Sequence, residues 1–230
     1  MKTQNQVWDI YTRLFHWLLV LGIAYQWVSM ELLDDAMEQH ALVGYGLLSL
    51  ILWRIIWGFI GPHTVRFRHF SPNLKTLFTY LRAKPKPVYA THNPLGSIAV
   101  LTFFGLILVQ SISGLFMTDD IFFSGPLLGW LDTTIENVIQ SLHDTSFDLL
   151  VLLILVHILA VVWHVLHAEP YLIKAMFHGK KPLITPPSMS NLQVHSRALV
   201  SLGIAITLVY CSVNYLPQWL GINPADDWDF

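Results

Sequence analysis

The sequence predicts an all-α integral membrane protein, a bundle of helices that spans a lipid bilayer. Hydrophobic residues make up 54% of the 230-residue chain and charged residues only 12%, about half the charged share of an ordinary soluble domain. The mean hydropathy is +0.52. Five apolar stretches are long enough to cross a bilayer, which takes roughly 20 helical residues. The segments that connect them alternate between basic and acidic.

The five expected spans are residues 14–30, 41–60, 95–117, 147–166 and 198–216. The first is the shortest, and the flank 7–13 extends it. No small-residue cleavage site follows this first span, so we do not expect a cleaved signal peptide. The second span contains one charge, Arg54.

The distribution of charge predicts the orientation. Lys and Arg occur at the N-terminus and in segments 61–93 and 167–197, whereas the alternate segments carry acidic residues without Lys or Arg. Because basic residues flank spans on the cytoplasmic side, we expect a bacterial inner-membrane protein with a cytoplasmic N-terminus. Five crossings then place the C-terminus in the periplasm.

Two inside segments are expected to form helices on the membrane surface. Ser71 and Pro72 supply an N-cap and a first-turn proline. The residues that follow put apolar side chains on one face beside two basic ones: Leu74, Leu77, Phe78 and Leu81 with Lys75 and Arg82. Residues 170–177 have a similar pattern, with Gly179 as the stop. Both patterns are typical of helices that lie on an anionic leaflet.

Cysteine usage narrows the choice of cofactor. The single Cys211 excludes an internal disulfide, a four-thiolate metal site and covalent haem attachment through a C-x-x-C-H motif. Eleven histidines remain as the main candidate ligands. Phosphate-binding glycine loops are absent from the sequence, and no nucleic-acid partner is expected.

Four histidines match in pairs by depth. His143, at the entry of the fourth span, and His157, within it, are fourteen residues apart. On one helix they share a face, with a rise of about 21 Å between them. His40 begins the second span at the outer depth, and His16 lies in the inner part of the first. Two stacked imidazole pairs are what two six-coordinate, non-covalent b-type haems require.

These histidines have other interpretations. A single histidine in a span is as readily a hydrogen-bonded core residue, but four matched by depth argue against this. His164 and His167 are alternative ligands, although His164, which shares the face of His157, lies near the inner interface. The remaining histidines of the inside segments are expected to be solvated or at the lipid surface: His63, His69, His92, His178 and His195.

Two arginines are candidate partners of the inner haem. Arg54 lies fourteen residues after His40, which returns it to the depth of the inner pair. Haem carries two propionates, and buried anions need a cation, so Arg54 and Arg13 are candidates for that role. The alternative is that Arg54 extends to the inner interface.

The motifs around these residues resemble the bacterial di-haem cytochrome b561 family, which includes the cytochrome b subunits of nickel–iron hydrogenases. They are residues 7–9 (VWD), 12–17 (TRLFHW), 40–45 (HALVGY), 57–58 (WG), 66–67 (RF), 92–96 (HNPLG), 142–144 (LHD) and 179–181 (GKK). The resemblance implies a four-helix di-haem domain over residues 1–182, with axial ligands His16, His40, His143 and His157. Residues 183–230 would add a linker, a fifth transmembrane helix and an acidic tail. Asp144 stands where the family often has Glu.

The resemblance implies electron transfer between membrane quinones and an extracytoplasmic redox partner, either a cytochrome c or a hydrogenase-like subunit. A homodimer is left open. Two other classes compete: a haem-free transporter with histidine proton relays, and a structural anchor subunit. The transporter predicts acidic residues near the histidines, and only Asp144 and Asp148 come close to them. The anchor subunit does not require histidines at matched depths.

Overall fold

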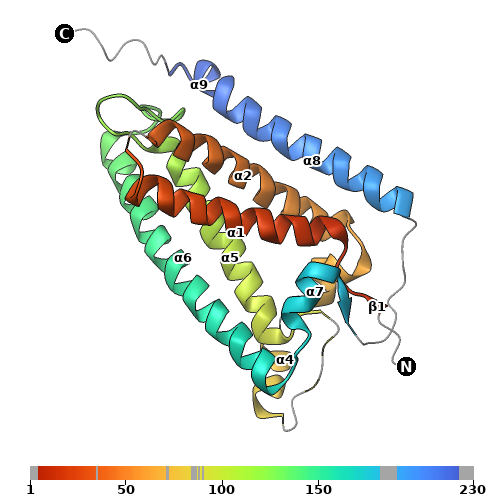
Figure 1. Cartoon of the computed structure of the whole chain (residues 1–230). Helices are drawn as coiled ribbons and strands as arrows, with labels where there is room; N and C mark the ends of the chain where they lie inside the picture. The colour runs from red at the N-terminus through yellow and green to blue at the C-terminus, as the bar shows by residue number, and fades with distance from the viewer. Residues whose placement is uncertain are drawn as a thin grey trace, which may run out of the picture. The chain divides into compact units, whose positions relative to one another are not determined.

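The computed structural model describes residues 5–34, 36–70, 73–83, 87, 89, 91–181 and 191–222. These residues are mainly helical (Figure 1). The long helices are α1 (Ile10–Glu31), α2 (Met37–Ile60), α5 (Pro94–Ser113), α6 (Thr133–His167) and α8 (Asn191–Asn214). The short elements are β1 (Asn5–Gln6), η1 (His63–Val65), α3 (Phe67–Phe70), α4 (Leu74–Arg82), η2 (Gly114–Phe116), α7 (Leu172–His178), β2 (Lys180–Lys181) and α9 (Leu216–Trp219).

Each of the five expected spans corresponds to one long helix, which confirms the predicted fold class. Among the described residues, four segments are long and apolar enough to cross a membrane: Met37–Ile60, Pro94–Phe116, Thr133–His167 and Leu192–Asn214. Helix α1 has 22 residues, which is sufficient length. It is not among the four, since polar residues such as Arg13, His16 and Gln26 interrupt its apolar run. A fifth crossing by α1 therefore stays a prediction.

Helix α6 is much longer than the apolar stretch that predicted it. It has 35 residues and starts at Thr133, fourteen residues before the expected span. At 1.5 Å per residue it is about 52 Å long, against about 30 Å for a hydrocarbon core. His143 lies in this polar extension, so α6 carries a histidine beyond the expected span.

The chain forms two compact units, and the long helices contribute residues to both. Unit 1 contains residues 1–17, 54–104 and 151–201, and unit 2 contains residues 18–53, 105–150 and 202–230. Trp57 and Val65 are completely buried in unit 1, and Ile51 is completely buried in unit 2. Both units therefore contain residues from each side of the expected domain boundary at residue 182. That boundary stays a prediction.

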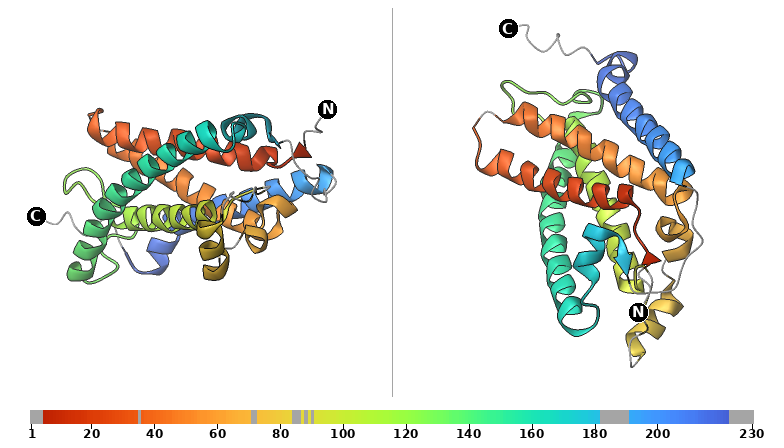
Figure 2. Two further views of the ribbon diagram at one scale, coloured as in Figure 1. Left: turned by 90° about the horizontal axis from the view of Figure 1, so that it is seen from below. Right: turned by 45° about the vertical axis from the view of Figure 1, so that its right-hand side comes forward.

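The amino-terminal segment of unit 1 is fastened to the end of α7. Strand β1 pairs with β2 in an antiparallel ladder (Figure 2), and the backbone N–H groups of Val7 and Trp8 donate to the Gly179 carbonyl at 2.7 and 3.1 Å. Gly179 has a φ of 77°, and a Cβ there would lie 2.5 Å from the Trp8 carbonyl oxygen. This confirms Gly179 as the stop of the second surface helix, because only glycine fits both the conformation and the close approach.

The first surface helix, α4, begins slightly later than expected. Its N-cap is Asn73, whose side-chain oxygen accepts from the Thr76 backbone N–H at 2.7 Å. Asparagine caps as well as serine, so Asn73 supplies the cap assigned to Ser71, which lies outside the described residues together with Pro72. Phe78 and Leu81 are exposed on α4. Binding of this helix to a lipid surface stays a prediction.

Candidate functional site

The candidate site residues divide between the two units. His40 and His143 belong to unit 2, whereas His16, His157 and Arg54 belong to unit 1. Each α6 histidine therefore lies in the same unit as the histidine with which depth matching pairs it: His143 with His40, and His157 with His16. Within the described ranges, no group of three or more His, Cys, Asp or Glu side chains could hold a metal ion. Pairs of histidines are typical of haem sites in which two imidazoles bind the iron, whereas zinc sites use three or four protein ligands.

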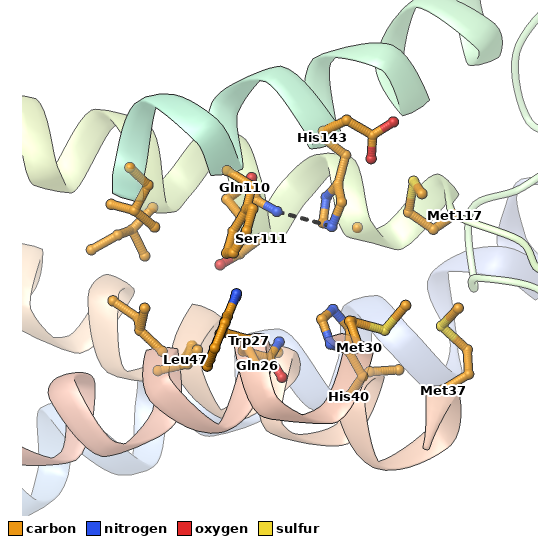
Figure 3. A pocket seen from close by; sticks show the side chains of 18 of the residues that line it. Gln26, Trp27, Met30, Met37, His40, Leu47, Gln110, Ser111, Met117 and His143 are labelled. Atoms are coloured by element: carbon orange, nitrogen blue, oxygen red, sulfur yellow. Dashed lines mark hydrogen bonds between the residues drawn. The ribbon is translucent and has the colours of Figure 1, made fainter. Parts of the chain in front are cut away.

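Unit 2 contains a cavity of about 340 Å³ lined by α1, α2, α5 and α6. His40 and His143 project toward one another from opposite walls (Figure 3), close enough for their charges to interact. The rest of the lining is largely apolar or aromatic, as at Trp27, Met30 and Met117. The volume of the cavity falls within the range of roughly 300–1,000 Å³ that is usual for small-molecule and cofactor pockets.

Hydrogen bonds hold both imidazoles of the cavity. The Ser29 hydroxyl lies 3.0 Å from His40 Nδ1, and the Ser113 hydroxyl lies 3.0 Å from His143 Nδ1. Gln110 Nε2 lies 2.9 Å from His143 Nε2. Gly114 leaves room beside the His143 ring, because a Cβ there would lie 3.1 Å from Cε1. No sequence motif pointed to these polar neighbours, because they come from other turns and other helices.

In unit 1, His16 and His157 are close enough to interact electrostatically. The Phe103 ring meets the His157 ring edge-on, with centroids 5.5 Å apart and planes at 89°. His16 Nδ1 is buried and has no hydrogen-bond partner within the described part of the chain. An imidazole with an unused buried nitrogen fits a site that a further group completes.

Arg54 is a buried cation with an unused donor. Its side chain is 3% exposed, and its charge lies 5.7 Å from the Phe67 ring centroid and 5.5 Å from that of Phe104. Its Nη2 donates weakly to the Val65 carbonyl at 3.4 Å, whereas Nη1 has no partner among the described residues. A guanidinium of this kind fits a carboxylate ligand such as a haem propionate.

Arg13 has a different environment. One of its terminal nitrogens donates to the Phe177 carbonyl, so this residue helps to fasten α7. Its Nε is buried without a partner in the described part of the chain. Arg13 therefore has one donor, Nε, for a cofactor carboxylate. One of its terminal nitrogens is used by the hydrogen bond to Phe177.

His92 was expected to be solvated, and that expectation is wrong. Its ring packs at 5.0 Å from the Trp8 ring. Burial, followed by the positive charges of Arg54 and Lys181, lowers the pKa of His92 to about 3. His92 is therefore a neutral imidazole in unit 1, beside Trp8 and close to the charges of Arg54 and Lys181. The burial of His92 could not be predicted from the sequence. His92 precedes the span, and a side chain at that place can face either solvent or protein.

These features are typical of a membrane cytochrome that binds b-type haem between helices. The family model of the prokaryotic cytochrome b561 matches residues 7–179. The chain therefore belongs to the prokaryotic cytochrome b561 family, which confirms the resemblance and makes it a membrane protein of b-type haem electron transfer. The motifs that carried the resemblance lie almost entirely within this range.

Similar curated proteins agree with this family. A protein of Azotobacter vinelandii is 24% identical over 213 residues, covering 77% of this chain and 88% of its own length. One of Bradyrhizobium diazoefficiens is 26% identical over 160 residues, covering 62% of this chain and 64% of its own. Both are named probable Ni/Fe-hydrogenase B-type cytochrome subunits. No solved structure matches the chain significantly.

Proposed function

We propose that the protein conducts electrons across the membrane through two non-covalent b haems, between the quinone pool and a redox partner outside the cytoplasm. The observation that supports this most directly is the pairing of histidines within each unit, with one α6 histidine in each pair. His40 and His143 face one another across the unit 2 cavity, and His16 and His157 are close enough to interact in unit 1. A bound haem supplies reversible one-electron chemistry at its iron.

The four histidines and two arginines of the candidate site have different roles in this function. The imidazoles of His40 and His143 hold the outer haem, and those of His16 and His157 hold the inner one. Arg54 and Arg13 bind carboxylates of the inner haem, which lets a charged group enter a low-dielectric interior. The largely apolar lining of the unit 2 cavity would surround the outer haem, and an iron held by two imidazoles would carry electrons rather than bind oxygen.

The external partner is a hydrogenase-like subunit or a cytochrome c. The names of the curated relatives favour the first. The acidic residues of the expected outer segments, such as Asp119 and Asp132, would steer a partner with a basic surface and raise its rate of association.

The first test is the haem content of the purified full chain. We expect a reduced-minus-oxidised spectrum of the b type, two haems per chain, and complete extraction of the haem by acid–acetone, since Cys211 cannot form a pair of thioether bonds. One haem per chain would remove one histidine pair from the proposal. A chain without haem would favour the transporter or anchor classes.

The second test is the orientation. A periplasm-active reporter fused after Phe230 should be active, and the same reporter placed near Lys84 should be inactive. A reporter that is active only in the cytoplasm should give the reverse pattern and serves as the control. The opposite result would reverse which haem faces which compartment.

A further inference from the structure

Two buried serines contact the histidines of the unit 2 cavity. Ser29 on α1 is 2% exposed and Ser113 at the end of α5 is 3% exposed. Each places its hydroxyl 3.0 Å from the Nδ1 atom of one imidazole, Ser29 at His40 and Ser113 at His143. The same contact therefore occurs on both walls of one cavity, from two different helices.

The direction of these hydrogen bonds follows from the proton of each hydroxyl. Ser113 Oγ donates to the Val109 carbonyl at 2.7 Å, and Ser29 Oγ donates to the Gln26 carbonyl at 3.0 Å. A serine hydroxyl has one proton to donate and lone pairs to accept with. With that proton on the carbonyl, each serine can only accept from its histidine, and this arrangement puts the ring proton of His40 and of His143 on Nδ1.

A second contact supports the same assignment at His143. Its Nε2 lies 2.9 Å from Gln110 Nε2, which is a donor only. The Gln110 amide is oriented by its own oxygen, which accepts from the Ser146 hydroxyl. His143 therefore accepts at Nε2 and donates at Nδ1. The lone pair that can bind a metal is on Nε2, the atom that reaches toward the cavity (Figure 3).

We propose that Ser29 and Ser113 are positioning residues for the outer haem: they fix the tautomer and ring orientation of His40 and His143 so that both offer an unprotonated Nε2 to the iron. This inference rests on the proposed function of those two histidines as axial ligands. Partners of the second ring nitrogen orient metal-bound histidines and raise their basicity. A bound iron would replace Gln110 as the partner of His143 Nε2.

The two serines also set the potential of one haem relative to the other. A hydroxyl that accepts from Nδ1–H increases electron donation by the imidazole, which stabilises oxidised iron and lowers the midpoint potential. His16 in unit 1 lacks such a partner, since its Nδ1 is unbonded among the described residues. The serine effect therefore belongs to the outer haem alone.

The test is a spectroscopic redox titration of the full-length, haem-loaded protein. Ser29→Ala and Ser113→Ala should each shift the midpoint potential of the same haem to a more positive value and leave the other unchanged. Ser29→Thr and Ser113→Thr should restore the original potential, because threonine keeps the hydroxyl. Ser49→Ala is the matched control: Ser49 is 8% exposed on α2, and its hydroxyl donates to the Tyr45 carbonyl.

The outcomes separate this inference from the proposed function. If both alanine variants titrate like Ser49→Ala, or if both haems shift equally, the positioning role is wrong. Loss of both haems from the alanine variants would make the serines general structural residues and also overturn it. Retention of both haems after His40→Ala and His143→Ala would instead contradict the ligand assignment itself.

Discussion

Replacing His40 or His143 with alanine is expected to remove or convert the same haem while the other haem stays intact. Both imidazoles line one cavity of unit 2, so each variant leaves the same iron with one protein ligand. An open axial position turns a low-spin haem high-spin or lets it dissociate. The two variants should therefore share one altered spectrum.

Replacing His16 or His157 with alanine should give a different, shared loss. His143 and His157 are separated by about 21 Å along α6, so a haem that bridges one helix gap cannot be held at both positions. Absorption and electron paramagnetic resonance spectra of the four variants, with the haem content of each, distinguish the two classes.

His164→Ala is the control for these variants. His164 is also on α6, but its Nδ1 lies 2.8 Å from the Ala160 carbonyl oxygen, as expected for a helix residue with a local partner. Both haems should remain in this variant. If His164→Ala matches His16→Ala while His157→Ala has no effect, His164 is the inner ligand and the fourteen-residue spacing is a coincidence.

Glu169→Gln is expected to destabilise unit 1 strongly. Glu169 Oε2 lies 3.0 Å from Lys181 Nζ, and the side chains are 22% and 3% exposed. Removing the carboxylate leaves the Lys181 ammonium buried without its counter-charge, a change that costs about 3–5 kcal/mol in buried pairs. Because Glu169 keeps some contact with solvent, we expect a loss near 3 kcal/mol, measured as a lower temperature of haem release and unfolding.

Two further variants test the cause of that loss. Lys181→Met combined with Glu169→Gln removes the uncompensated charge and should recover most of the stability. Lys180→Ala is the matched control, since Lys180 is the exposed neighbour on β2, and it should change the stability by less than about 0.5 kcal/mol. A Glu169→Gln variant as stable as the control would mean that the pair contributes nothing.

Length, apolar runs and motifs were enough to predict the fold class and the family. A helix in a bilayer must satisfy its backbone internally, so an apolar run of sufficient length already defines a helix and its approximate place. The residues around His16, His40 and His143 carry the family resemblance in short local motifs. Their roles as haem ligands, like that of Arg54, stay predictions that the haem measurements test.

The polar extension of α6 could not be predicted from its apolar run. Hydropathy ends where polar residues begin, near Phe147, but the helix continues for as long as its backbone hydrogen bonds do, back to Thr133. The same reason explains the cap of α4: Asn73 and Ser71 are equally good caps by type, and only the backbone geometry selects Asn73.

The residues alone were therefore enough to predict the local features: the helices, the family, and the position of each histidine along its own helix. The partners of those histidines were decided by tertiary structure alone. Ser29 and Ser113 contact imidazoles eleven and thirty residues away. His92 packs beside Trp8 and lies close enough to Arg54 to interact with its charge. Hydropathy and periodicity describe one helix at a time, whereas a hydrogen bond between helices depends on the position and rotation of both.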